Sequence, residues 1–90
     1  MKVTCEISLY PFHKKYKETI INFVQRLKTY KKIVIETNGM STQLFGDYEL
    51  IMDILKKEFR STFENDKAVF VFKMAKGERT KNKLPKALKK

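Results

Sequence analysis

The 90-residue sequence has one cysteine, no tryptophan, three glycines and two prolines. Because Cys5 is alone, the chain has no intrachain disulfide framework and no cysteine-rich zinc cluster. The single histidine, His13, has no Cys, Asp or Glu at ligand spacing around it, so we expect no metal site. No apolar run approaches the ~20 residues that span a bilayer, and Glu6 interrupts the stretch where a signal peptide is apolar. We therefore expect a cytoplasmic protein with no membrane insertion and no cofactor.

Catalytic motifs are also lacking. The sequence has no glycine-rich phosphate loop, no nucleophile elbow and no pair of acidic residues at metal-binding spacing. The segment after the first predicted strand, residues 11–15, lacks the arginine and the glycine cradle that an acylphosphatase uses to hold phosphate. These absences indicate a protein that is not an enzyme.

Positive charge, in contrast, is abundant, with 20 Lys and Arg residues against 10 Asp and Glu residues and a net charge of +10. Residues 1–75 account for a net +4, whereas residues 76–90 account for +6 and have almost no apolar content. Such a segment buries too little surface to offset the entropy of ordering. We expect a folded domain over residues 1–75 and a basic, disordered tail over residues 76–90.

Hydrophobic periodicity predicts six elements in the folded part. Alternation of apolar and polar residues indicates strands, and apolar residues spaced by three or four indicate amphipathic helices. Asp47 is the expected N-cap of the second helix, which should fray at residues 61–63. In chain order these elements are a strand at 3–9, a helix at 14–30, strands at 33–37 and 41–45, a helix at 48–63 and a strand at 68–74.

This order is typical of an α+β, ferredoxin-like βαββαβ sandwich, in which two helices cover one face of a four-stranded antiparallel sheet. In the second helix, Tyr48, Ile51, Met52, Leu55 and Phe59 are expected to form the buried face. The other face of the sheet then has no cover within the domain. We expect a second copy of the chain or a ligand to cover it, which makes a homodimer or higher homo-oligomer through the sheet the expected assembly.

One segment is unusually polar for a simple hairpin. Residues 36–46 contain several hydroxyls and amides beside a carboxylate, and Glu6 and Ser8 share a face of the first strand. Neighbouring strands bring these two groups toward one pocket, suited to a small, flat, hydrogen-bonding ligand that is neutral or cationic. Tyr10, Met40 and Phe45 are candidates to contact its ring, although such residues also serve as core. The candidate ligand-binding residues are Glu6, Ser8, Tyr10, Thr37, Asn38, Met40, Ser41, Thr42 and Phe45.

Three segments also resemble a known family. Residues 6–11 (EISLYP), 37–48 (TNGMSTQLFGDY) and 68–73 (AVFVFK) are similar to the YkoF-like family of thiamine- and hydroxymethylpyrimidine-binding proteins. The resemblance covers residues 3–76 and implies a ferredoxin-like fold and a small-molecule binding protein for thiamine or its hydroxymethylpyrimidine precursor, acting in vitamin uptake or handling without catalysis. It places ligand contacts at Glu6, Ser8, Thr37, Ser41 and Thr42. Name-giving members have two such domains, and self-association is the natural substitute in a single-domain chain.

Two alternatives stay open. The first is a ligand-free homo-oligomeric regulatory or interaction domain, in which the polar hairpin only shapes an interface. The second is a basic RNA-binding module, since RNA-recognition domains share this topology. Residues 41–45 lack the aromatic signature of those domains, so we expect no specific nucleic acid and only tail-driven, non-specific binding.

Overall fold

The structure is a computed structural model that describes residues 1–78 and residue 87. Its elements follow the predicted order, and the prediction of an α+β, ferredoxin-like βαββαβ fold is confirmed. They are β1 (Lys2–Pro11), α1 (Tyr16–Leu27), β2 (Val34–Thr37), β3 (Thr42–Asp47), α2 (Tyr48–Asn65) and β4 (Ala68–Lys76).

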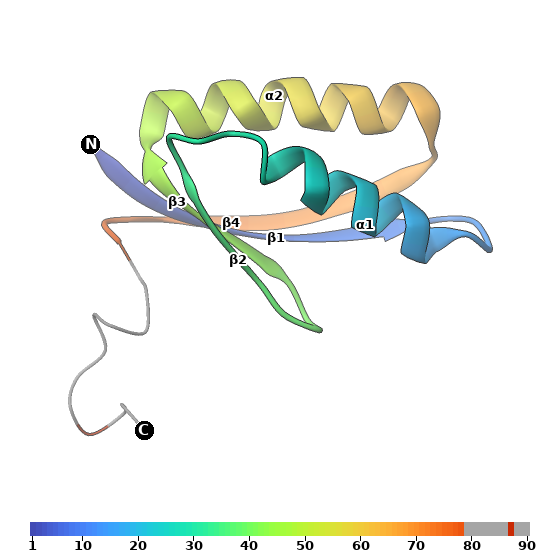
Figure 1. Cartoon of the computed structure of the whole chain (residues 1–90), viewed down its shortest axis with the longest axis horizontal. Helices are drawn as coiled ribbons and strands as arrows, with labels where there is room; N and C mark the ends of the chain where they lie inside the picture. The colour runs from blue at the N-terminus through green and yellow to red at the C-terminus, as the bar shows by residue number, and fades with distance from the viewer. Residues whose placement is uncertain (79–86, 88–90) are drawn as a thin grey trace.

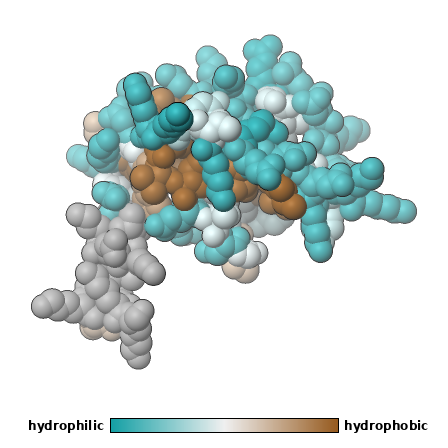
Figure 2. Space-filling view, in the orientation of Figure 1, coloured by the Kyte–Doolittle hydropathy of each residue, from teal (hydrophilic) through white to brown (hydrophobic). Residues whose placement is uncertain are grey.

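The four strands form one antiparallel sheet in the order β2-β3-β1-β4. Both helices lie on the same side of it, and the hairpin of β2 and β3 bends away from the long strands β1 and β4 (Figure 1). No helix of the described residues lies over the other side of the sheet, which is called the open face below. Hydrophilic residues cover most of the view in Figure 2, apart from an apolar band across its middle.

The core lies between the sheet and the helices. Alternation in β1 directs Val3, Cys5, Ile7 and Leu9 into it, and these side chains are buried. Burying an aliphatic side chain contributes about 1.5–3 kcal/mol, so this strand is a main source of stability. From the other elements the core receives Phe23, Leu27, Ile33, Leu44, Ile51, Ile54 and Leu55.

The structure differs from the predicted second helix in two respects. The buried stripe of α2 runs through Ile51, Ile54, Leu55, Glu58 and Thr62, a spacing of three or four residues, and Met52 is 38 % exposed beside it. The predicted fraying was also wrong. The helix continues to Asn65 because Thr62 lies at 3 % exposure between the helices, where Arg26 of α1 donates to its hydroxyl at 3.1 Å.

The other ends of the helices and strands lie close to the predicted ends. The first helix is shorter than predicted, since after Leu27 the chain closes with tight turns in which the N–H groups of Thr29 and Tyr30 donate three residues back. Asp47 precedes α2, but its carboxylate pairs with the N-terminal ammonium at 3.2 Å, which lowers the pKa of Asp47. β4 ends at Lys76, and Gly77 donates its N–H to Lys2. The rest of the predicted tail lies outside the described residues, except for Glu78 and residue 87.

A buried polar cluster joins the two helices. The carboxylate of Glu58, only 5 % exposed, accepts hydrogen bonds from Arg26 Nε at 2.7 Å and from the Tyr30 hydroxyl at 2.6 Å. Arg26 also donates to Thr62, and Thr62 donates to the Glu58 carbonyl. Charge-assisted bonds of this length are among the strong hydrogen bonds in proteins. The cluster therefore fixes α1 against α2.

This cluster predicts a loss of stability at high pH. Burial, reinforced by the Glu58 carboxylate, raises the pKa of Tyr30 from its usual 10 to about 12. The folded state thus holds this proton more tightly than the unfolded state, so the stabilisation is complete below pH 10 and disappears as the pH rises from 10 to 12. Urea unfolding across this range should show the free energy of unfolding of the wild type falling more steeply than that of Tyr30→Phe.

Cys5 acts in the same direction, since burial raises the pKa of its thiol to about 11. Because both proteins retain Cys5, the difference between their pH profiles isolates Tyr30. Parallel profiles from pH 10 to 12 would show that folding does not raise the pKa of Tyr30.

Candidate functional site

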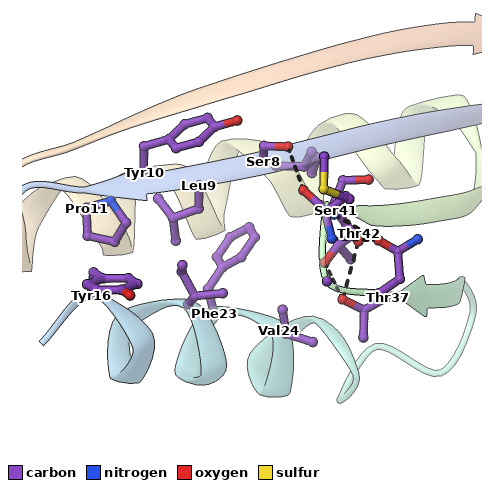
Figure 3. A pocket seen from close by; sticks show the side chains of 15 residues that line it. Ser8, Leu9, Tyr10, Pro11, Tyr16, Phe23, Val24, Thr37, Ser41 and Thr42 are labelled. Atoms are coloured by element: carbon purple, nitrogen blue, oxygen red, sulfur yellow. Dashed lines mark hydrogen bonds between the residues drawn. The ribbon is translucent and has the colours of Figure 1, made fainter.

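A cavity of about 340 Å³ lies between α1, the second half of β1 and the tip of the β2–β3 hairpin (Figure 3). Its volume is at the lower end of the roughly 300–1,000 Å³ typical of small-molecule sites. Seven of the nine predicted binding residues line it: Ser8, Tyr10, Thr37, Asn38, Met40, Ser41 and Thr42. Their role in binding stays a prediction, but the structure does bring them to one place.

The cavity exists because β1 is longer than its partner β3. The β1–β3 pairing stops at Ile7 opposite Thr42, whereas on the other side β1 pairs with β4 as far as Pro11 opposite Ala68. Beyond Ile7, the hairpin tip stands apart from β1, and α1 passes along the helix side of the resulting gap (Figure 3). A difference in strand length thus leaves a space between the helix and the sheet edge.

The apolar wall comes from α1 and β1. Tyr16, Ile20, Phe23 and Val24 of α1 face the cavity together with residues of β1 such as Leu9. The sequence does not identify these α1 residues as a cavity wall, because residues of a cavity wall and of a core-facing helix stripe have the same spacing. No sequence signal separates the two roles, and it is the structure that shows Tyr16 exposed at 46 % and Phe23 buried on this stripe.

The polar wall is the hairpin tip. The hydroxyls of Thr37 and Thr42 are hydrogen-bonded to each other at 2.9 Å, and Thr42 is 5 % exposed. Asn38 Oδ1 accepts the N–H groups of Met40 at 2.8 Å and Ser41 at 3.2 Å, which gives the tip its turn. Thr37, Asn38 and Thr42 therefore have a local structural role as well as a position at the cavity.

Glu6 and Phe45 do not line this cavity. Glu6 lies on the open face, where it accepts a hydrogen bond from the Ser41 hydroxyl at 3.0 Å and pairs with Lys73 at 3.4 Å. These contacts, the Ser41 bond first, lower the pKa of Glu6. Phe45 is buried nearer the other end of β3. Of the expected pocket, Ser8 therefore lines the cavity with the hairpin residues, whereas Glu6 contacts its wall only through Ser41.

Among the described residues, none that lines the cavity is charged, although a third of the sequence is Asp, Glu, Lys or Arg. The carboxylate of Glu6, which contacts the lining residue Ser41, is already paired with Lys73. Hydroxyls, an amide and main-chain groups are the polar atoms that a ligand would meet, beside aliphatic and aromatic side chains. Such a site suits an uncharged or weakly charged planar molecule better than a strongly charged one.

His13 connects the loop between β1 and α1 to the loop between α2 and β4. Its Nδ1 accepts the Lys15 N–H at 3.1 Å, and its Nε2 lies 3.0 Å from both Asp66 and Thr19.

Within the part of the chain that the structure describes, no three His, Cys, Asp or Glu side chains gather closely enough to hold a metal ion. In the same residues, no helix has both the length and the apolar character needed to cross a membrane.

The model of the YKOF-related family matches residues 2–77, which is nearly the whole described chain. The chain belongs to the YKOF-related family. The match begins at β1 and ends just after β4, so it covers the complete βαββαβ fold of this chain. None of the curated proteins matches the chain.

Solved structures show the same fold. A protein of Thermotoga maritima, provisionally assigned to thiamine biosynthesis or salvage, aligns with a TM-score of 0.75 at 22 % identity, covering 82 % of each chain. A Streptococcus pneumoniae protein aligns with a TM-score of 0.79 at 20 % identity, over 87 % of this chain and 89 % of its own. A Methanocaldococcus jannascii protein aligns with a TM-score of 0.73 at 25 % identity, over 98 % and 93 %. These three proteins therefore share the fold of this chain.

Proposed function

We propose that this protein binds thiamine or its hydroxymethylpyrimidine precursor in the cavity between α1 and the hairpin tip, and serves vitamin uptake or handling without catalysis. Membership of the YKOF-related family and the provisional assignment of the T. maritima neighbour to thiamine biosynthesis or salvage support a thiamine-related role. The observation that carries the proposal is the uncharged cavity of about 340 Å³ with hydroxyls on one wall and apolar side chains on the other.

The chemistry of the ligand agrees with these walls. An aminopyrimidine has an exocyclic amine, ring nitrogens and two flat faces. The hydroxyls of Thr37 and Ser41 and the Asn38 amide offer hydrogen bonds to its edge, while Phe23 and Val24 of α1 can cover a face. No part of this scheme requires a nucleophile or a general base, which is why we propose binding alone.

Calorimetric titration with thiamine, thiamine monophosphate, thiamine diphosphate and free hydroxymethylpyrimidine tests this function. At least one of these compounds should bind with a stoichiometry near one per chain and raise the melting temperature. Recovery of the bound compound unchanged, by NMR after long incubation, would support binding without catalysis. No heat and no thermal shift with any of the four at millimolar concentration would overturn the proposal.

Glu6 should contribute to binding through Ser41. The Glu6→Gln variant weakens the anchor of the Ser41 hydroxyl, because the carboxylate that accepts it is replaced by an amide. Since this contact lies outside the cavity, we expect the dissociation constant to rise by only about two- to fivefold. Glu36→Gln, on exposed β2, is the matched control and should bind normally. Equal affinity of wild type and Glu6→Gln would remove Glu6 from the site.

The open face supports a second proposal, a homodimer through the sheet. Val34 on β2, Val69 and Val71 on β4, and Tyr10 on β1 are all large side chains exposed by more than 40 %, and Val71 reaches 57 %. Their register places these residues on the side away from the helices. A stable dimer typically buries about 800 Å² on each partner, and a four-stranded face can supply that area.

Light scattering after size-exclusion chromatography tests the dimer. The wild type should have the mass of two chains and Val71→Lys that of one, because a face-to-face pair would bury the added lysine charge of each chain without a partner. Ile21→Lys, at an exposed position of α1 on the helix side, is the control and should remain dimeric. A monomeric wild type would contradict the dimer. A dimer that binds none of the four compounds would favour the ligand-free interaction domain.

A further inference from the structure

The main chain of β1 offers hydrogen bonds to the cavity that no strand uses. In an antiparallel pair, successive residues direct both their N–H and their C=O alternately to one side and to the other. Gly77 donates to the Lys2 carbonyl and Phe12 donates to Lys67, so even-numbered residues of this stretch direct their main-chain groups toward β4. Tyr48 donates to the Met1 carbonyl, which shows that odd-numbered residues are directed toward β3.

This alternation identifies Leu9. Ile7 directs its main-chain groups toward Thr42, the first residue of β3, and is the last odd-numbered residue of β1 with a partner in the β1–β3 ladder. Leu9 is the next odd-numbered residue, and its N–H and C=O leave the strand on the same side. Pro11 follows in the same orientation, which is consistent with a residue that has no N–H to donate.

The hairpin tip does not complete the ladder. Continued register would place Met40 opposite Leu9. The Met40 N–H donates instead to Asn38 Oδ1 at 2.8 Å, and the Met40 carbonyl accepts a long bond, 3.5 Å, from the Ser8 hydroxyl. Among the described residues, the Leu9 N–H and C=O have no protein partner in the ladder or in the loops.

Leu9 is nonetheless a nearly buried residue. Its exposure is 8 %, and it lines the cavity between α1 and the hairpin tip (Figure 3). Buried main-chain donors are almost always paired, with protein, water or a ligand. An adjacent donor and acceptor on the wall of a cavity without charges form a pair of groups that a flat molecule can contact edge-on.

We infer that the N–H and C=O of Leu9 bind the edge of the ligand, and that the ligand class is an uncharged planar heterocycle with a hydrogen-bond donor next to an acceptor. This inference rests on the proposed function and makes it more specific. In an aminopyrimidine, the exocyclic amine and the adjacent ring nitrogen form such a pair. The ring then extends the plane of the sheet and turns one face toward α1. Thiamine and its phosphates carry the same aminopyrimidine, so this contact would recognise the pyrimidine end of each of these compounds.

Amide hydrogen exchange followed by NMR tests the inference on the intact protein. In the free protein the Leu9 amide should exchange faster than the Ile7 amide, which is paired with β3. Saturating hydroxymethylpyrimidine should slow exchange of the Leu9 amide by about tenfold or more and leave Ile7 nearly unchanged. The analogue that lacks the exocyclic amine should bind about tenfold more weakly, since it leaves the Leu9 carbonyl without its donor.

The possible outcomes distinguish a failure of this inference from a failure of the proposed function. Binding of hydroxymethylpyrimidine with unchanged exchange at Leu9, or equal affinity for the analogue without the amine, would overturn the inference and leave the binding function standing. No binding of any of the four compounds would overturn both.

Discussion

Replacing Glu58 by alanine should lower the free energy of unfolding by about 3 kcal/mol, a large effect for a polar side chain. The carboxylate is 5 % exposed and accepts bonds of 2.7 Å from Arg26 and 2.6 Å from Tyr30. Removing it leaves a guanidinium and a phenol beside a small void. Arg26 is partly exposed and regains water, so the cost lies near the lower end for a broken buried pair.

Thermal and urea denaturation check this prediction. For a chain of this size a loss of about 3 kcal/mol lowers the melting temperature by roughly 10–20 °C. Glu64→Ala is the matched control on the same helix, because its ion pair with Arg60 is 3.7 Å long and exposed on both sides and contributes at most about 0.5 kcal/mol. If Glu58→Ala and Glu64→Ala were equally stable, the cluster would not be what fixes α1 against α2.

The cluster matters to the site because α1 is a wall of the cavity. Arg26 lies on the same helix as Phe23 and Val24, which face the cavity, and Glu58 ties that helix to α2. A carboxylate outside the cavity thus determines the position of the apolar wall. We expect substitutions in this cluster to affect ligand binding through the placement of α1, in addition to stability.

The sequence predicted the fold because alternation and helical spacing are both clear. β1 shows this best, since every second residue from Val3 to Leu9 is apolar and buried. Glu58 and Thr62 were not identified as buried, because polar residues on a helix stripe look like surface residues until a second helix supplies Arg26 and Tyr30 as partners. The length of α2 was missed for the same reason.

The site was predicted only in part. The hydroxyls and the amide of residues 37–42 stand out in sequence because they exceed what a hairpin turn requires. The cavity itself depends on the difference in length between β1 and β3, which propensity and periodicity do not define. Side-chain composition likewise gives no information on the main-chain groups of Leu9, since their direction follows from strand register alone.

Replacing both Thr37 and Thr42 by valine should weaken ligand binding by about 30- to 100-fold while changing stability little. The two hydroxyls are hydrogen-bonded to each other at 2.9 Å on the polar wall of the cavity. Removing both leaves no unpaired partner in the free protein, so the folded state loses little. The ligand, in contrast, loses the hydroxyls that pair with its edge, which corresponds to about 2–3 kcal/mol of binding free energy.

The single variant Thr37→Val separates binding from folding. It leaves the Thr42 hydroxyl, in a residue that is 5 % exposed, without its partner, and we expect it to cost about 1–3 kcal/mol of stability. The single variant should therefore be less stable than the double variant, although the double variant binds more weakly. Thr29→Val, an exposed threonine at the end of α1 and outside the cavity, controls for the substitution itself. Calorimetry that finds wild-type affinity in the double variant would place the ligand elsewhere on the protein, and the hollow of about 370 Å³ around Glu6 and Lys73 on the open face would then be the site to test.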